Sequence, residues 1–173
     1  TMGGDHSLTL PILRSMAKKH GPLALVHVDA HADVNDDMFG ERETHGTVFR
    51  RAYEEGLLVP ELVFQVGLRG TGYTALDFSE AAGWGFNMIT APDIWHKSLT
   101  PLGKDVQSAI GNHPCYLSYD IDSLDPAYAP GTGTPEIGGL TTPQAMEFIR
   151  ALHGLNIVGL SLIHISEPTR RVL

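Results

Sequence analysis

Short apolar runs alternate along this chain with longer segments whose hydrophobic residues recur every three or four positions. The apolar runs predict strands at 23–28, 61–67, 86–90, 115–119 and 156–165. The helical periodicity predicts helices at 8–20, 47–56, 74–82, 101–111 and 143–154. Strands that alternate with helices in this way indicate βαβ units. The predicted fold class is therefore α/β, with a mainly parallel sheet and helices on both of its faces.

Residues with known preferences for helix ends support these boundaries. Ser7 is the expected N-cap of the first helix, and Gly21 ends it. Thr142 with Pro143 begins the last helix, and Gly154 ends it. No strand precedes the first helix, although this architecture supplies one at that place. We therefore expect the domain to be incomplete at its N-terminus.

Composition and charge limit the classes of function. The 173 residues are 42% hydrophobic and 18% charged, which fits a domain with a sizeable core. A formal net charge of -8 argues against nucleic acid or an anionic membrane as a partner, since both bind basic surfaces. The single cysteine, Cys115, excludes an internal disulfide and a cysteine-rich zinc site. The sequence shows no signal peptide and no apolar run of membrane length, so the expected location is cytoplasmic.

The segment DAHAD places three ionisable side chains at alternate positions directly after an apolar strand. Its members are Asp29, His31 and Asp33. Side chains two apart in an extended chain point to the same face, so a carboxylate, an imidazole and a carboxylate are predicted to converge. Without a partner, such a cluster repels itself and resists burial. Three such groups have few structural uses, so DAHAD is the strongest functional signal in the sequence.

Two further polar clusters fall at the same predicted edge of the sheet, outside the carboxyl ends of the strands. Asp120 and Asp122 follow the strand at 115–119, and His6 lies in GGDHS just before the first helix. Taken alone, His6 is more often a structural residue, and the aspartate pair is as often structural as functional. Their convergence with DAHAD from separate parts of the chain favours one site.

Together these clusters supply ligands for two divalent cations. Four aspartates carry the four negative charges that two such ions neutralise, and two histidines complete a set of oxygen and nitrogen donors. The six predicted ligands are His6, Asp29, His31, Asp33, Asp120 and Asp122. Carboxylates and imidazoles without thiolate suit manganese or magnesium, and the imidazoles favour manganese. Because two bridged metals can hold a hydroxide that attacks at neutral pH, the sequence predicts a hydrolase.

Four segments follow one another in the order GGDHS, DAHAD, THGT and SYDIDSLDPAYAPGTGTPEIGGLT, and they span residues 3–141. Together they resemble the signature segments of the ureohydrolases, the arginase and agmatinase family. The resemblance implies a three-layer α/β/α sandwich, two Mn²⁺ ions per subunit on the six residues above, and a homo-oligomer. It also implies that a small guanidino substrate is hydrolysed to urea and an amine. The substrate would be agmatine, which gives putrescine in polyamine metabolism, or a guanidino acid.

The resemblance also implies roles for residues beyond the metal ligands. His45, in THGT, is expected beside the substrate, where it relays a proton to the leaving amine, and Asp33 is grouped with it as catalytic. Thr134, in GTGTP, matches a substrate-binding position near the guanidinium. Taken alone, His45 is better interpreted as a loop histidine near a turn at Gly46, and Thr134 as part of a turn-rich loop. The run at 33–51 resembles agmatinases and guanidino-acid hydrolases more than arginases, without choosing a substrate.

The match to the family ends after Gly159. Where the family has an acidic residue followed three positions later by a glutamate that holds the guanidinium, this chain has Ser161 and His164. An imidazole cannot replace that glutamate as the partner of a cation. We therefore divide the chain into a partial catalytic domain at 1–159 and a tail at 160–173 that is expected to be non-native, from a frameshift or read-through. If the tail is native, His164 should leave metal binding intact and abolish guanidine turnover.

Two alternatives stay open beside this interpretation. A non-catalytic module for metal binding or subunit contact would bind metal without hydrolysing any guanidino compound. A metal-dependent deacylase on a related fold would hydrolyse acylated amines and produce no urea, although six ligands suit two metals better than the single metal common in that chemistry. The favoured interpretation is a fragment of an agmatinase-like ureohydrolase, truncated at both ends and without the substrate glutamate.

Overall fold

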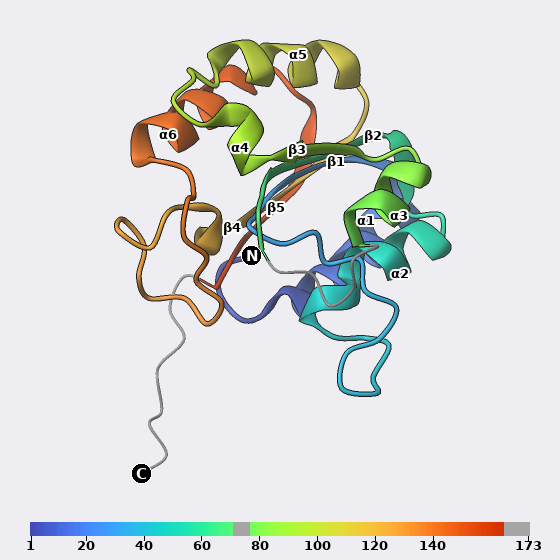
Figure 1. Cartoon of the computed structure of the whole chain (residues 1–173). Helices are drawn as coiled ribbons and strands as arrows, with labels where there is room; N and C mark the ends of the chain where they lie inside the picture. The colour runs from blue at the N-terminus through green and yellow to red at the C-terminus, as the bar shows by residue number, and fades with distance from the viewer. Residues whose placement is uncertain (71–76, 165–173) are drawn as a thin grey trace.

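The computed structural model describes residues 1–70 and 77–164, which form a parallel sheet between two layers of helices (Figure 1). The five strands are β1 (Leu23–Val28), β2 (Leu58–Leu68), β3 (Asn87–Thr90), β4 (Cys115–Asp120) and β5 (Ile157–Ile163). Their order across the sheet is β3-β2-β1-β4-β5, and every neighbouring pair is parallel. The predicted α/β class with a mainly parallel sheet is confirmed.

Helices cover both faces of this sheet. The α-helices are α1 (Thr9–His20), α2 (Val48–Glu54), α3 (Asp77–Gly83), α4 (Ala91–Ile94), α5 (Thr100–Ile110) and α6 (Thr142–Ala151). Single 3₁₀ turns form η1 (His6–Leu8), η2 (His45–Thr47) and η3 (Ile121–Ser123). One layer contains α1, α2 and α3, and the opposite layer contains α4, α5 and α6 (Figure 1). The expected three-layer α/β/α sandwich is therefore present.

The central strand β1 shows why the sequence folds this way. All six of its residues are buried. Leu23 and Leu25 pack in the core beneath α1 and α2, while Ala24, Val26 and Val28 pack in the core beneath α5 and α6. A strand covered on both faces needs an apolar residue at nearly every position, which is why LALVHV lacks the alternation of a half-exposed strand. His27 is the polar exception within it.

The first residues of the chain lie along the outer edge of β5. Met2 forms a parallel bridge with Leu162, and the amide of Gly3 donates to the carbonyl of Leu162 over 2.8 Å. This pairing brings η1 and its first residue, His6, to the carboxyl ends of the strands. Residues 160–163 continue β5 in register with β4. The predicted division of the chain near residue 160 stays a prediction, and its residues 165–173 lie outside the described residues.

Three local details differ from the prediction. Ser7 does not cap α1: its amide donates to the Asp5 carboxylate over 2.8 Å, which caps η1, and α1 begins two residues later. α6 begins at Thr142 as predicted, after a capping box formed by Thr141 and Gln144, but it ends at Ala151, three residues before the expected Gly154. The one-turn helix α4 was not predicted, because four residues carry too little periodicity. The start of the predicted helix at 74–82 lies outside the described residues.

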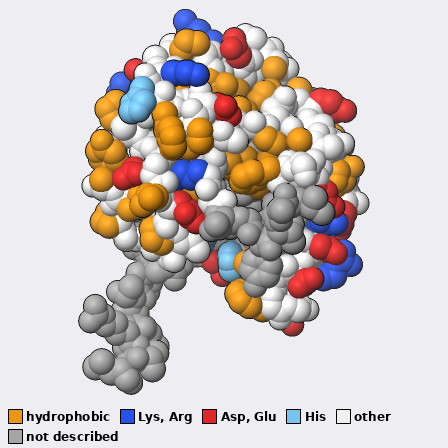
Figure 2. All heavy atoms as spheres, viewed as in Figure 1, with side chains coloured by type: hydrophobic (Ala, Val, Ile, Leu, Met, Phe, Trp, Pro, Cys, Tyr) orange, Lys and Arg blue, Asp and Glu red, His pale blue; other side chains and the backbone are white. Residues whose placement is uncertain are grey.

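Two further features describe the surface and the helices. Figure 2 shows acidic, basic and hydrophobic side chains interspersed over one face of the protein. Within residues 1–70 and 77–164, no helix is both long and apolar enough to cross a membrane.

Candidate metal centre

All six predicted metal ligands lie together at the carboxyl ends of β1 and β4. They come from η1, from the segment after β1, from the end of β4 and from η3. Their potential ligand atoms form three overlapping groups, each with atoms within 4.8 Å of one another: His6, His27, Asp29 and Asp33; Asp29, His31 and Asp122; and Asp120, Asp122 and His164. The structure thus brings the six together and adds two histidines to them.

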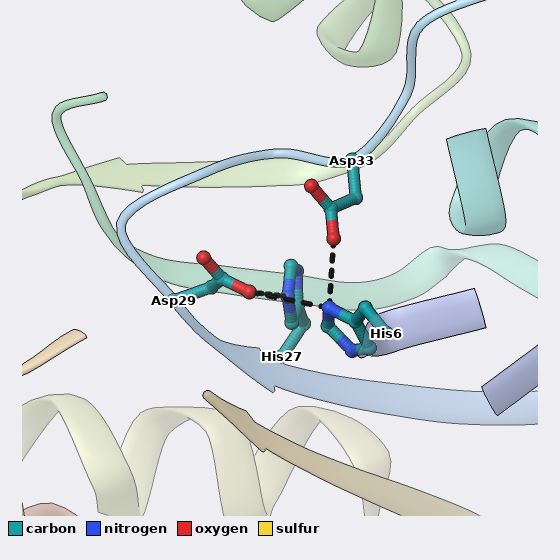
Figure 3. A group of neighbouring side chains, drawn as sticks. All are labelled: His6, His27, Asp29 and Asp33. Atoms are coloured by element: carbon teal, nitrogen blue, oxygen red, sulfur yellow. Dashed lines mark hydrogen bonds and ion pairs between the residues drawn. The ribbon is translucent and has the colours of Figure 1, made fainter. Parts of the chain in front are cut away.

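His6 is the most enclosed member of the site, with no exposed surface. Its Nδ1 lies 2.7 Å from Oδ2 of Asp33, 3.4 Å from Oδ2 of Asp29 and 3.9 Å from Oδ2 of Asp120. Its Nε2 lies 2.7 Å from the hydroxyl of Ser118 on β4. Figure 3 shows the Asp29 and Asp33 carboxylates directed toward the His6 ring. The contact with Ser118 leaves Nδ1 as the atom of His6 that faces the carboxylates.

The segment DAHAD reaches the site through a bend and not as an extended strand. β1 ends at Val28, and Asp33 has a φ of 53°, in the left-handed region. Asp29 accepts a hydrogen bond at Oδ1 from the amide of His31 over 2.6 Å. The His31 Nδ1 lies 3.2 Å from Oδ2 of Asp122. The predicted convergence is therefore found, but the alternation argument that led to it was wrong.

Asp120 and Asp122 are held by their own backbone and by a neighbouring loop. Asp120 accepts from the amide of Asp122 over 3.1 Å. Asp122 accepts at Oδ1 from the amide of Ala30 over 3.2 Å, and at Oδ2 from the hydroxyl of Thr134 over 2.9 Å. These bonds fix the side chains so that their remaining lone pairs face the other carboxylates.

Charge and burial perturb the ionisation of these groups strongly. Asp29, Asp120 and Asp122 are each 1% exposed. Burial and the negative charge of Asp29 raise the pKa of Asp120 to about 7, and the same two causes raise the pKa of Asp122. Burial alone would lower the pKa of His31, but its contacts with the Asp122 and Asp29 carboxylates raise that pKa to about 11. Buried carboxylates this close together require positive charge among them.

The donor set fits divalent cations. Four carboxylates and two imidazoles without a thiolate are the ligands that metals such as Mn²⁺ take. The Nδ1 of His6 is buried among three carboxylates, and the nearest of their oxygens, Oδ2 of Asp33, lies 2.7 Å away. One imidazole carries at most one positive charge, so it cannot balance three buried carboxylates. A cation between this nitrogen and the carboxylates would satisfy both.

A cavity of about 300 Å³ opens beside this cluster. Its wall includes Asp29, His31, Asp33 and Asp120 on one side, and Asn35, Met38, Thr134 and Glu136 among the others. His45, at the start of η2, also lines it. The two residues predicted to contact substrate, His45 and Thr134, are therefore placed at the cavity, while their roles stay predictions.

Arg69 is a residue of the site that the sequence did not reveal. It is half-buried, and its guanidinium donates to backbone carbonyls of three segments at distances from 2.7 to 3.2 Å. The acceptors are the carbonyls of Gly67, Asp122, Ser123, Leu124, Glu136 and Ile137. Arg69 thereby ties the loop that carries Thr134 and Glu136 to the turn that carries Asp122. A sequence gives no signal for a cation that recognises only backbone.

His164 and Glu136 also lie at the centre. The Nδ1 of His164 lies 2.5 Å from Oδ2 of Asp120, and the imidazole lines the cavity. Glu136 places Oε1 3.6 Å from Nε2 of His31. The position of His164 agrees with its expected place at the pocket, and its φ of 56° is one that side chains rarely adopt.

Comparisons with known proteins agree on one family. A family model described as the Arginase family matches residues 1–169, so the match extends past Gly159, where we expected it to end. A guanidinobutyrase of Pseudomonas aeruginosa is 60% identical over 168 residues, which cover 97% of this chain and 53% of that protein. A mitochondrial guanidino acid hydrolase of Homo sapiens is 52% identical over 168 residues, covering 97% of this chain and 48% of that protein.

A solved structure shows the same architecture. The proclavaminate amidino hydrolase from Streptomyces clavuligerus superposes with a TM-score of 0.88 and is 41% identical, covering 95% of this chain and 55% of that chain. The chain thus spans about half the length of the relatives it matches.

Proposed function

Because this chain belongs to the Arginase family, we propose that the protein is a metal-dependent hydrolase that cleaves a guanidino group to urea and an amine. The observation that carries the proposal is the convergence of four aspartates and two histidines beside one cavity, three of the aspartates being almost fully buried. A guanidino acid such as guanidinobutyrate is the favoured substrate class, since the two relatives named above are a guanidinobutyrase and a guanidino acid hydrolase. Agmatine is the alternative amine-bearing substrate.

We propose two Mn²⁺ ions at the centre. The residues that would hold them are His6, Asp29, His31, Asp33, Asp120 and Asp122. When bound, such ions act as Lewis acids and supply a water of lowered pKa as the nucleophile. The three carboxylates around Nδ1 of His6 and the raised pKa of Asp120 support a cationic occupant, because buried negative charge is costly without one.

The cavity wall would orient the substrate by charge. A guanidinium is cationic, and the described wall carries the carboxylates of Asp29, Asp33, Asp120 and Glu136. Fixed carboxylates in a site shielded from water hold a cation without the reorganisation that solvent requires. The hydroxyl of Thr134 donates to Asp122, so it keeps that carboxylate facing the centre.

We propose that His45 handles the proton of the reaction. Hydrolysis of a guanidino group is completed when the leaving nitrogen receives a proton, and an imidazole is suited to transfer one near neutral pH. His45 lines the cavity from η2, on the wall next to Gly46. We therefore assign the proton relay to His45 and a supporting role at the nucleophile to Asp33, whose carboxylate lies 2.7 Å from His6.

A second function, that of a metal-binding chain without turnover, is favoured by one observation. His164 occupies the cavity wall and contacts Asp120 over 2.5 Å, at the place where the sequence predicts the loss of a substrate carboxylate. An imidazole there would compete with a guanidinium for the same acidic groups. The homo-oligomer and the cytoplasmic location expected from the sequence stay predictions.

Urea release tests the proposed function. The Mn-loaded chain and a version extended at both ends to the length of its relatives would be given guanidinobutyrate, guanidinopropionate, agmatine and arginine. The proposal expects urea from a guanidino acid with the extended protein. Two bound metals with no urea from any substrate would favour the non-catalytic function, and hydrolysis of acylated amines without urea would favour a deacylase.

A further inference from the structure

His27 is a fully buried histidine that stands behind the candidate metal centre. It belongs to β1, has no exposed surface and is absent from the cavity wall. Its ring packs against Phe49 of α2 with centroids 4.3 Å apart. Its Nε2 lies 2.7 Å from Oδ2 of Asp29, a carboxylate shared by two of the three ligand groups. Figure 3 shows His27 between the side chains of Asp29 and His6.

Gln65 on the neighbouring strand β2 fixes the hydrogen bonding of this imidazole. Gln65 is itself fully buried and is the register partner of His27 in the sheet. Its Nε2 lies 2.7 Å from the carbonyl of Ala32 and 2.8 Å from Nδ1 of His27. A carbonyl only accepts hydrogen bonds, so the atom beside Ala32 must be the amide nitrogen. The second hydrogen of this nitrogen is then directed at His27.

The tautomer of His27 follows from this arrangement. Because Nδ1 accepts from Gln65, it carries no proton, and the proton of the neutral ring must be on Nε2. Nε2 therefore donates to Oδ2 of Asp29. With one nitrogen accepting and the other donating, His27 has no lone pair left for a metal, although it belongs to a group whose atoms are close enough for one.

We infer that His27 is a positioning residue for the metal centre, holding the Asp29 carboxylate in orientation through a hydrogen bond whose direction is set by Gln65 and the Ala32 carbonyl. This inference rests on the proposed metal centre. Ala32 lies between the proposed ligands His31 and Asp33. The loop that carries these two ligands therefore also fixes the tautomer of His27. Partners of ligating groups typically contribute 10–100-fold to metal affinity, and we expect a loss of that order when the donor is removed.

Two substitutions separate positioning from packing. H27F keeps an aromatic ring against Phe49 but removes the donor to Asp29. H27Q removes the ring but keeps an amide nitrogen near the place of Nε2. Positioning predicts that Mn²⁺ or Co²⁺ binds H27F about 10–100-fold more weakly than the unsubstituted chain, with H27Q closer to that chain. Packing alone predicts the opposite order.

Metal binding is measured by calorimetry, and the visible spectrum of the Co²⁺-loaded chain reports ligand geometry independently of activity. Circular dichroism establishes that each variant is folded. Should H27F not fold, Q65M takes its place: it keeps the volume of Gln65 and removes the amide, so it should weaken binding and alter the spectrum. A chain with both H27F and Q65M should bind metal no more weakly than H27F alone, because His27 and Gln65 act as one unit.

The outcomes separate this inference from the proposed function. If the unsubstituted chain binds neither Mn²⁺ nor Co²⁺, both are overturned. If that chain binds metal and folded H27F or Q65M matches it in affinity and spectrum, His27 has no positioning role and only this inference fails. Weak binding by H27Q with unchanged binding by H27F would identify a packing role and overturn the inference as well.

Discussion

The Nδ1 atom of His6 lies 2.7 Å from Oδ2 of Asp33, which joins the turn before α1 to the bend after β1. Both residues are buried, and they lie far apart in the sequence. The contact exists because residues 1–4 run along β5 and deliver His6 to the same end of the sheet as Asp33. The centre is therefore a product of the whole α/β arrangement and not of one motif.

Metal affinity should rise with pH. In the metal-free protein, the pKa of His31 is raised to about 11 and that of Asp120 to about 7, so His31 carries a proton at neutral pH and Asp120 is partly protonated. A metal must displace these protons. Between pH 6 and pH 8 we expect the apparent affinity for Mn²⁺ to increase about tenfold per pH unit for each proton released. Calorimetry in buffers of different ionisation enthalpy measures the number released, and a pH-independent affinity would contradict the prediction.

Removal of metal should destabilise the protein. Without cations, the buried carboxylates of Asp29, Asp120 and Asp122 repel one another at close range. A metal that binds only the folded chain, present at 100 times its dissociation constant, should raise the free energy of unfolding by about 2.7 kcal/mol. Chemical unfolding with Mn²⁺ and with a chelator provides the comparison. Equal midpoints under the two conditions would show that no cation occupies the centre.

Gly70 should be required for the position of His31. A Cβ atom at this glycine would lie 2.7 Å from Nε2 of His31 and would also meet its Cδ2. Overpacking of this kind costs about 1–3 kcal/mol, and here it displaces a proposed ligand. We expect Gly70→Ala to weaken Mn²⁺ binding, whereas Gly83→Ala, whose Cβ meets nothing within 4 Å, serves as the matched control. Equal Mn²⁺ affinity of the two variants would contradict the prediction that Gly70 is required for the position of His31.

His164→Glu should restore a carboxylate for the substrate. If the imidazole blocks guanidine turnover, the variant should retain metal and release urea at a higher rate than the unsubstituted chain. His153→Glu, at an exposed position outside the site, controls for added negative charge. Steady-state urea release at saturating Mn²⁺ provides the measurement. A variant that binds metal fully but gains no turnover would show that His164 is not the cause of a defect.

The strand and helix pattern and the convergence of the six side chains could be predicted because both depend on local residue types. Apolar runs such as LALVHV mark strands, and the carboxyl ends of parallel strands meet at one edge, so Asp29 and Asp120 had to be near each other. The left-handed turn at Asp33 could not be predicted, since non-glycine residues adopt it only under tertiary constraint. The extended-chain argument for DAHAD therefore gave the right neighbours for the wrong reason.

The residues that escaped prediction act through partners distant in sequence. Gln65 matters only because the sheet register places it beside His27, and that register is set by packing across the whole domain. Arg69 recognises backbone carbonyls, so no complementary side chain accompanies it in the sequence. Both are interior polar residues near strand ends. An unexplained polar residue in an apolar strand, as Gln65 is in ELVFQVG, is a signal that could have indicated the first of them, whereas the sequence gives none for Arg69.

The number of metal ions bound per chain tests the central claim most directly. Elemental analysis of the folded, Mn-equilibrated protein should give two ions per chain, with fewer in His6→Ala, because the Nδ1 that faces the carboxylates is lost. His153→Ala, which removes an exposed histidine outside the site, should retain both. Absence of bound metal in the unsubstituted chain, or an unchanged count in folded His6→Ala, would contradict the account of a metal centre built on these side chains.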